Sequence, residues 1–104
     1  MGYYTHFNLR ILEGNPYLIE DFREKYESAK FAINENGESR DSTKWYDNEK
    51  DLRAFSKKHP TTLFELSGEG EDSGDQWKKY FKNGKMQTCR AAITFEPFNE
   101  SKLQ

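Results

Sequence analysis

The first pattern along the chain is an alternation of apolar and polar side chains over residues 3–12. Phe7, Leu9 and Ile11 share one face of an extended segment there, and polar side chains fall on the other face. A period of two residues is typical of a strand with one buried face. We therefore predict a half-buried strand at residues 3–12.

Two later segments carry apolar residues at the three- and four-residue spacing of amphipathic helices. Asn15 suits the start of the first helix because it can cap free amides, and Pro16 is tolerated in the first turn. Pro60 ends the second helix because proline cannot continue a helical ladder. The predicted helices span residues 16–34 and 48–58.

Four further segments have strand-forming or extended character: residues 43–46, 61–67, 76–82 and 85–95. The last two flank Asn83-Gly84, a dipeptide that favours a tight hairpin because both residues accept a positive φ. A two-residue turn pairs Phe81 with Met86 and Trp77 with Arg90. It places Trp77, Phe81 and Met86 on the same face of the hairpin.

This order of elements predicts one α+β domain, with two helices packed on one face of a mainly antiparallel four- to five-stranded sheet. The length of 104 residues suits a single domain. We place the domain at residues 1–96 and expect residues 97–104 to form a loose C-terminal tail. The expected core residues are Phe7, Leu9, Ile11, Phe22, Tyr26, Phe55, Phe64 and Leu66.

The amino-acid composition affects only which residue types we expect in the core. Hydrophobic residues make up 34% of the chain and charged residues 33%, a balance that by itself favours disorder. Aromatic residues, at 15%, compensate because each buries a large area, so that a small core needs few side chains. The surface is then expected to be highly charged.

The net charge and the cysteine content limit the kinds of partner and the localisation that we expect. The formal net charge is -2, and acidic and basic residues are interspersed, so no long-range field attracts nucleic acid or anionic lipid. Cys89 is the single cysteine, and no apolar run resembles a membrane span or a signal peptide. We expect a cytoplasmic monomer or small homo-oligomer that has no membrane partner.

No catalytic or metal-binding motif stands out. Cys89 with His6 or His59 would suit a hydrolase or transferase, but only residue identity supports such a pair, and free cysteine usually behaves as a small buried hydrophobe. The acidic loop at residues 68–75 fails the calcium-loop spacing because Tyr80 stands where a bidentate Glu is required. We predict no enzymatic activity, no cofactor and no metal.

Two candidate surfaces remain. Exposed aromatics and the acidic loop suit a protein interface, and a basic aromatic hairpin at residues 76–90 suits single-stranded nucleic acid. The protein-binding candidates are Trp45, Tyr46, Glu69, Glu71, Asp72, Asp75, Trp77 and Tyr80. The nucleic-acid candidates are Lys78, Lys79, Lys82 and Lys85. Core packing is the alternative for Trp45, and simple protection of an exposed hairpin is the alternative for the lysines.

A family resemblance covers about the second half of the chain. Its residues are Ser42-Thr43-Lys44-Trp45, His59-Pro60, Leu63-Phe64-Glu65-Leu66, Gly70 and Asn83-Gly84-Lys85. In these the chain resembles the YubB-like, ferredoxin-like domains encoded by phages and plasmids. The resemblance implies a ferredoxin-like fold and an accessory protein of a mobile element, without catalytic residues to carry over.

Small phage proteins commonly bind and inhibit a host protein, and the resemblance extends that expectation to this chain. We therefore expect a non-enzymatic protein-binding module of phage or mobile-element origin, acting in the host cytosol. An inhibitor of a defence nuclease, comparable to an anti-CRISPR protein, is one such module. The alternative is a single-stranded nucleic-acid-binding domain that uses residues 76–90.

Overall fold

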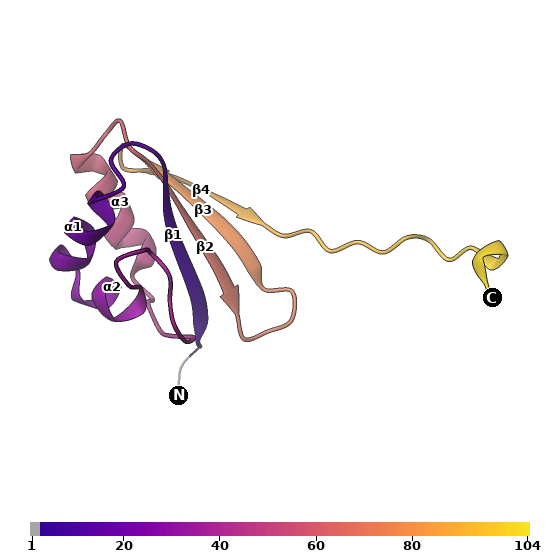
Figure 1. The fold of residues 1–104 in the computed structure, drawn as a ribbon. Helices are drawn as coiled ribbons and strands as arrows, with labels where there is room; N and C mark the ends of the chain where they lie inside the picture. Colours follow the sequence, from indigo (N-terminus) through magenta and orange to yellow (C-terminus); the bar gives the residue numbers. More distant parts are fainter. Residues whose placement is uncertain (1–2) are drawn as a thin grey trace.

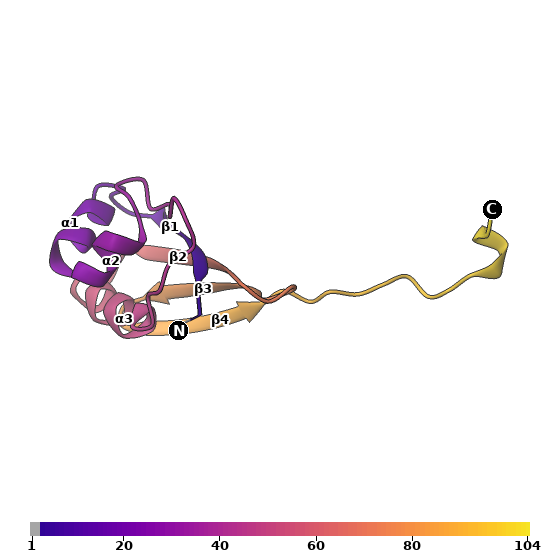
Figure 2. The ribbon, with the colours of Figure 1, turned by 90° about the horizontal axis from the view of Figure 1, so that it is seen from below.

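The computed structural model describes residues 3–104. Three helices on one side cover a single sheet, as Figures 1 and 2 show. The helices are α1 (Leu18–Lys25), α2 (Glu27–Ala32) and α3 (Asn48–Lys58). The strands are β1 (Thr5–Glu13), β2 (Leu63–Gly70), β3 (Gln76–Lys82) and β4 (Lys85–Arg90). The predicted α+β class is confirmed.

The sheet is an antiparallel meander with the strand order β1-β2-β3-β4. All three helices lie between β1 and β2 in the sequence. A ferredoxin-like domain instead has the order β-α-β-β-α-β. The ferredoxin-like arrangement is therefore not confirmed, and four strands form the sheet.

The first predicted helix, at residues 16–34, is wrong in extent. Tyr26 adopts an extended conformation with φ -119° and ψ 109°, which separates α1 from α2. The centroid of its ring lies 5.0 Å from that of Phe22 and 6.5 Å from that of Phe55. The break between the helices therefore coincides with tertiary packing, and no Gly or Pro at this position predicts it. The second helix, Asn48–Lys58, begins and ends as predicted.

The hairpin is confirmed, but its second strand is shorter than predicted. Phe81 pairs with Met86 and Trp77 with Arg90. The amide of Ala91 donates to the carbonyl of Gln76, the first residue of β3, at 2.9 Å. Beyond this bond β3 offers no further partner, so β4 ends at Arg90 and not at residue 95.

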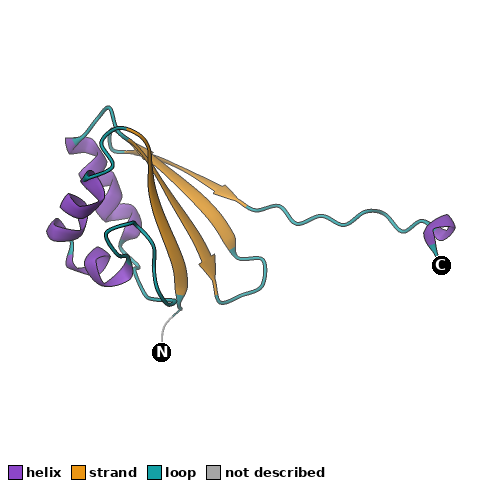
Figure 3. Ribbon diagram, viewed as in Figure 1, coloured by secondary structure: helices purple, strands orange, loops and turns teal. Residues whose placement is uncertain are grey.

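The chain after Arg90 leaves the body of the molecule. Residues 91–99 form neither helix nor strand, and a short 3-10 turn, η1 (Glu100–Lys102), follows. Figure 3 shows this segment as an extended loop that runs away from the sheet. No helix within residues 3–104 is long and apolar enough to cross a membrane.

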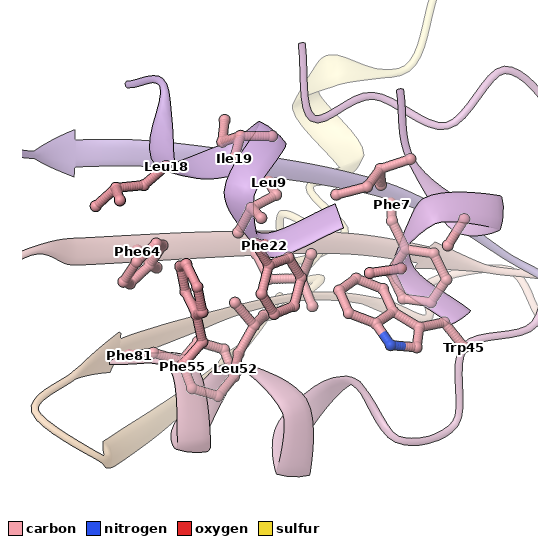
Figure 4. Close-up of a cluster of buried hydrophobic side chains, with 14 residues drawn as sticks. Phe7, Leu9, Leu18, Ile19, Phe22, Trp45, Leu52, Phe55, Phe64 and Phe81 are labelled. Atoms are coloured by element: carbon pink, nitrogen blue, oxygen red, sulfur yellow. The ribbon is translucent and has the colours of Figure 1, made fainter. Parts of the chain in front are cut away.

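The core lies between the helices and the sheet (Figure 4). Six of the eight expected core residues are buried, while Ile11 and Tyr26 are partly buried and pack against the cluster. The helices contribute Phe22, Leu52 and Phe55 from one side. The core also takes up Trp45 and Phe81, so aromatic rings supply much of its volume, as composition predicts.

Candidate functional site

The pleat of the sheet divides its side chains between a closed face, which meets the helices, and an open face, which the helices do not cover. β3 contributes Trp77, Lys79 and Phe81 to the closed face and Lys78, Tyr80 and Lys82 to the open face. Neighbouring side chains of a strand point to opposite faces. The candidate lysines are therefore separated by the sheet.

Lys79 belongs to the closed face and is buried. Its ammonium group donates to Oδ1 of Asn48 at 2.9 Å, lies 2.9 Å from a carboxylate oxygen of Glu49, and sits 4.2 Å from the centroid of the Trp77 ring. All of these partners are residues of the same chain. Lys79 is thus a structural residue, and its expected role as a nucleic-acid contact is wrong.

Both tryptophans also serve the interior. Trp45 is 2% exposed, packs edge-on to Phe7 with ring centroids 5.4 Å apart, and donates its indole N–H to Asp51 at 3.0 Å. Trp77 is partly buried and covers Gly68, where a Cβ would overlap the indole. Trp45 is therefore not an exposed anchor, and Trp77 is only partly exposed.

Glu65 occupies the middle of the open face and is only 4% exposed. Arg10 and Lys78 approach its two carboxylate oxygens to 3.7 and 3.8 Å, and interaction with the same carboxylate raises the pKa of the Tyr80 phenol. The sequence pattern did not predict this cluster. The feature that could have indicated it is the single acidic residue within the otherwise apolar segment 63–66.

Cys89 and His6 line one groove of about 590 Å³ on the open face, but they do not form a catalytic pair. They belong to β4 and β1, with two strands between them. At about 4.8 Å per strand spacing, roughly 14 Å separates their backbones. His59 instead packs against Phe55 with ring centroids 4.6 Å apart. Within residues 3–104, no three His, Cys, Asp or Glu side chains converge as a metal site.

Tyr3 joins two regions that are far apart in the sequence. Its hydroxyl donates to Asp75 at 2.5 Å and accepts from the amide of Asp72 at 3.0 Å. Its amide donates to the hydroxyl of Tyr46 at 2.9 Å. The bond to Asp75 raises the pKa of the Tyr3 phenol above its ordinary value. The acidic loop is thereby fixed beside Tyr46.

Tyr4 extends the same surface. Its amide donates to Glu71 at 2.6 Å, and the Lys44 ammonium group lies 5.0 Å from the centroid of its ring. The tyrosines remain exposed, with 67% exposure for Tyr46. We call this surface the acidic tyrosine patch; it consists of Tyr3, Tyr4, Tyr46, Glu71, Asp72 and Asp75.

The remaining candidates lie elsewhere. Glu69 faces His6 across the open face, away from the patch. Lys82 and Lys85 face each other beside the hairpin turn. The loop carboxylate of Asp75 approaches Arg90 to 3.9 Å, so within the described residues the loop pairs with the N-terminal tyrosines and Arg90 and not with the β3 lysines.

The comparisons with known proteins give no family assignment. No family model, no curated protein and no solved structure matches the chain. A function can therefore be inferred only from the residues of this chain and their arrangement.

Proposed function

We propose that the protein is a non-enzymatic protein-binding module that engages its partner through the acidic tyrosine patch. The observation that carries the proposal is Tyr3, whose hydroxyl bonds to Asp72 and Asp75 of the acidic loop and whose amide donates to the Tyr46 hydroxyl. Tyrosine is enriched at the energetic centres of interfaces because it offers a large rigid ring and a polar end. A patch fixed in advance also loses little conformational entropy on binding.

The charge of the patch defines the class of partner. Glu71, Asp72 and Asp75 contribute three carboxylates to the patch, against two nearby cations, Lys44 and Arg90. Such a surface repels phosphate and attracts a basic protein surface through electrostatic steering. The partner is accordingly a protein with a basic binding face, and raised salt weakens the association.

A defence nuclease fits this description. Proteins that bind nucleic acid do so with Lys- and Arg-lined surfaces that neutralise phosphates. The acidic tyrosine patch matches such a surface in charge and offers rings that can replace stacked bases. Together with the resemblance to phage and plasmid proteins, this supports a mobile-element inhibitor that acts in the host cytosol and occupies the nucleic-acid site of a host enzyme.

The test is a capture experiment with matched variants. Tagged protein is used to enrich partners from bacterial lysate, with quantification by mass spectrometry. Tyr46→Ser, and separately Glu71→Gln with Asp72→Asn, should lose a partner that the parent retains. Tyr17→Ser, and Glu27→Gln with Glu35→Gln, remove comparable exposed groups elsewhere and should retain it.

A partner lost equally in the control variants, or retained in all of them, would contradict the role of the patch. For the finer proposal the recovered protein is purified and its nucleic-acid cleavage measured. The parent should inhibit cleavage and the patch variants should not. Intact cleavage at saturating parent protein would exclude inhibition of a nuclease.

A second candidate function rests on the open face. Lys78, Lys82 and Lys85 share this face with Tyr80, which combines cations with an aromatic ring in the manner of single-strand binding surfaces. Fluorescence anisotropy with a labelled oligonucleotide at low salt tests it. Binding should be lost in Lys78→Glu with Lys82→Glu and kept in Lys50→Glu, a control on α3. Absence of binding by the parent removes this function.

A further inference from the structure

The C-terminal segment, residues 91–104, has the sequence of a strand but no strand partner. Ala91, Ile93 and Phe95 continue the alternation of β4, yet the segment forms no ladder beyond the bond from Ala91 to Gln76. Its large apolar side chains are exposed: Ile93 by 63%, Phe95 by 89%, Phe98 by 79% and Leu103 by 66%. Exposed apolar residues gathered on one segment indicate an interaction site.

The sheet offers one open edge among the described residues. The outer edge of β1 is partly covered, because Thr43 bridges to Thr5 and Glu38 bridges to Asn8. β4 is the last strand of the order and has no neighbour on its outer side. An unpaired edge presents a row of amide and carbonyl groups to which another extended chain can add.

A groove of about 470 Å³ adjoins this edge at the beginning of β4. Leu63, Tyr80 and Met86 give it an apolar floor, and Lys82 and Lys85 line it as cations. The C-terminal segment carries Ala91, Ile93 and Phe95 at alternate positions, so these side chains share one face when the segment is extended. The apolar side chains of the segment therefore match the apolar floor of the groove.

The direction of the C-terminal segment indicates whether it binds its own molecule or a second copy. A twofold-symmetric antiparallel pair centred on Arg90 would place Phe95 of a second molecule opposite Lys85 and Ile93 opposite Gln87, on the open face where the groove lies. The segment leaves its own β4 at Arg90, the end far from the groove. To reach its own groove it would have to reverse direction, and residues 91–96 contain no Gly or Pro for a turn.

We propose that two copies of this chain form a symmetric dimer in which residues 91–96 of each copy add antiparallel to the outer edge of β4 of the other. Phe95 occupies the groove beside Lys85, and Phe98 packs next to it. The contact is the same in both directions, as twofold symmetry requires. The segment adjoins the acidic loop at Ile93, whose side chain lies beside Gly74, and the dimer would display two acidic tyrosine patches.

Oligomeric state is measured first, on the purified full chain, by light scattering after size-exclusion chromatography over a range of concentrations. The parent should be a dimer, and Phe95→Ser with Phe98→Ser should be a monomer. Phe31→Ser, which removes an equally exposed ring from α2, should remain a dimer. A monomeric parent at all concentrations overturns the proposal, as does a dimer that survives the double substitution.

The edge itself is tested with Thr88→Pro. Because the Ala91 amide bonds inward to Gln76, alternate amides of β4 point inward and that of Thr88 points outward. Proline there removes an edge donor without removing a bond to β3 and should abolish the dimer. Hydrogen exchange should show amide protection of residues 92–96 in the parent and not in Thr88→Pro. Unprotected amides in a dimeric parent would refute strand addition. These tests use the chain alone, so their failure leaves the proposed partner binding untouched.

Discussion

Lys78 and Lys79 are neighbours in β3, yet the two faces of the sheet give them opposite roles. Lys79 lies on the closed face, bonded to Asn48 and Glu49 and stacked on Trp77. Lys78 lies on the open face with its side chain 55% exposed, and its partner Glu65 lies beneath it. A run of basic residues in a strand therefore places only every second residue on any one surface.

The closed face should respond most to loss of volume. Phe22→Ala is expected to lower the free energy of unfolding by about 3 to 5 kcal/mol, because it leaves a cavity among Tyr26, Trp45 and Phe55. Chemical denaturation measures the change. Phe31→Ala, at an exposed site, should change stability by less than about 0.5 kcal/mol. Equal effects would mean that Phe22 is not a core residue.

Added volume gives the next effect. Gly68→Ala places a methyl group against the Trp77 indole on the closed face and should cost about 1 to 3 kcal/mol. Ser67→Ala, one residue earlier and on the open face, should fall within about 0.5 kcal/mol of the parent. The midpoints of thermal unfolding compare the two. A Gly68→Ala variant that unfolds at the same temperature as the parent would show that Trp77 can move away from the sheet without cost.

The two lysines themselves provide the most direct comparison. Lys79→Ala leaves the buried Asn48 oxygen without its donor and should lower stability by about 1 to 3 kcal/mol. Lys78→Ala loses an exposed ion pair and should cost less than about 1 kcal/mol. Denaturant titration distinguishes them, and the order of the two losses is the result that matters. A larger loss for Lys78→Ala would reverse the assignment of faces.

The smallest effect concerns the titration of Tyr80. The Glu65 carboxylate raises the pKa of Tyr80 above its ordinary value near 10, so folding is favoured below that value and this contribution is lost as pH rises through the folded-state pKa. Glu65→Gln should move the pKa of Tyr80 downward. Tyrosinate absorbance measures the shift, and Tyr80→Phe identifies the signal. An unchanged titration would exclude the interaction with Glu65.

Several elements could be predicted because their causes are local. The period of two in β1, the Asn83-Gly84 turn and the stop of α3 before Pro60 all follow from residues that are close in sequence. The break at Tyr26 could not be predicted in this way, since it accompanies packing against Phe55 of α3. Of the proposed patch, the sequence supplied Tyr46 and the acidic loop but not the tyrosine that joins them.

The α+β class, the hairpin register and most of the core follow from the sequence alone, because side-chain periodicity selects which face of each element is apolar. Other features depend on long-range packing. It placed Lys79 inside and Lys78 outside, brought Tyr3 to Asp75 across 72 residues of chain, and ended β4 where β3 has no further partner. These outcomes depend on contacts between distant segments, whose positions follow only from the way the helices and strands pack together.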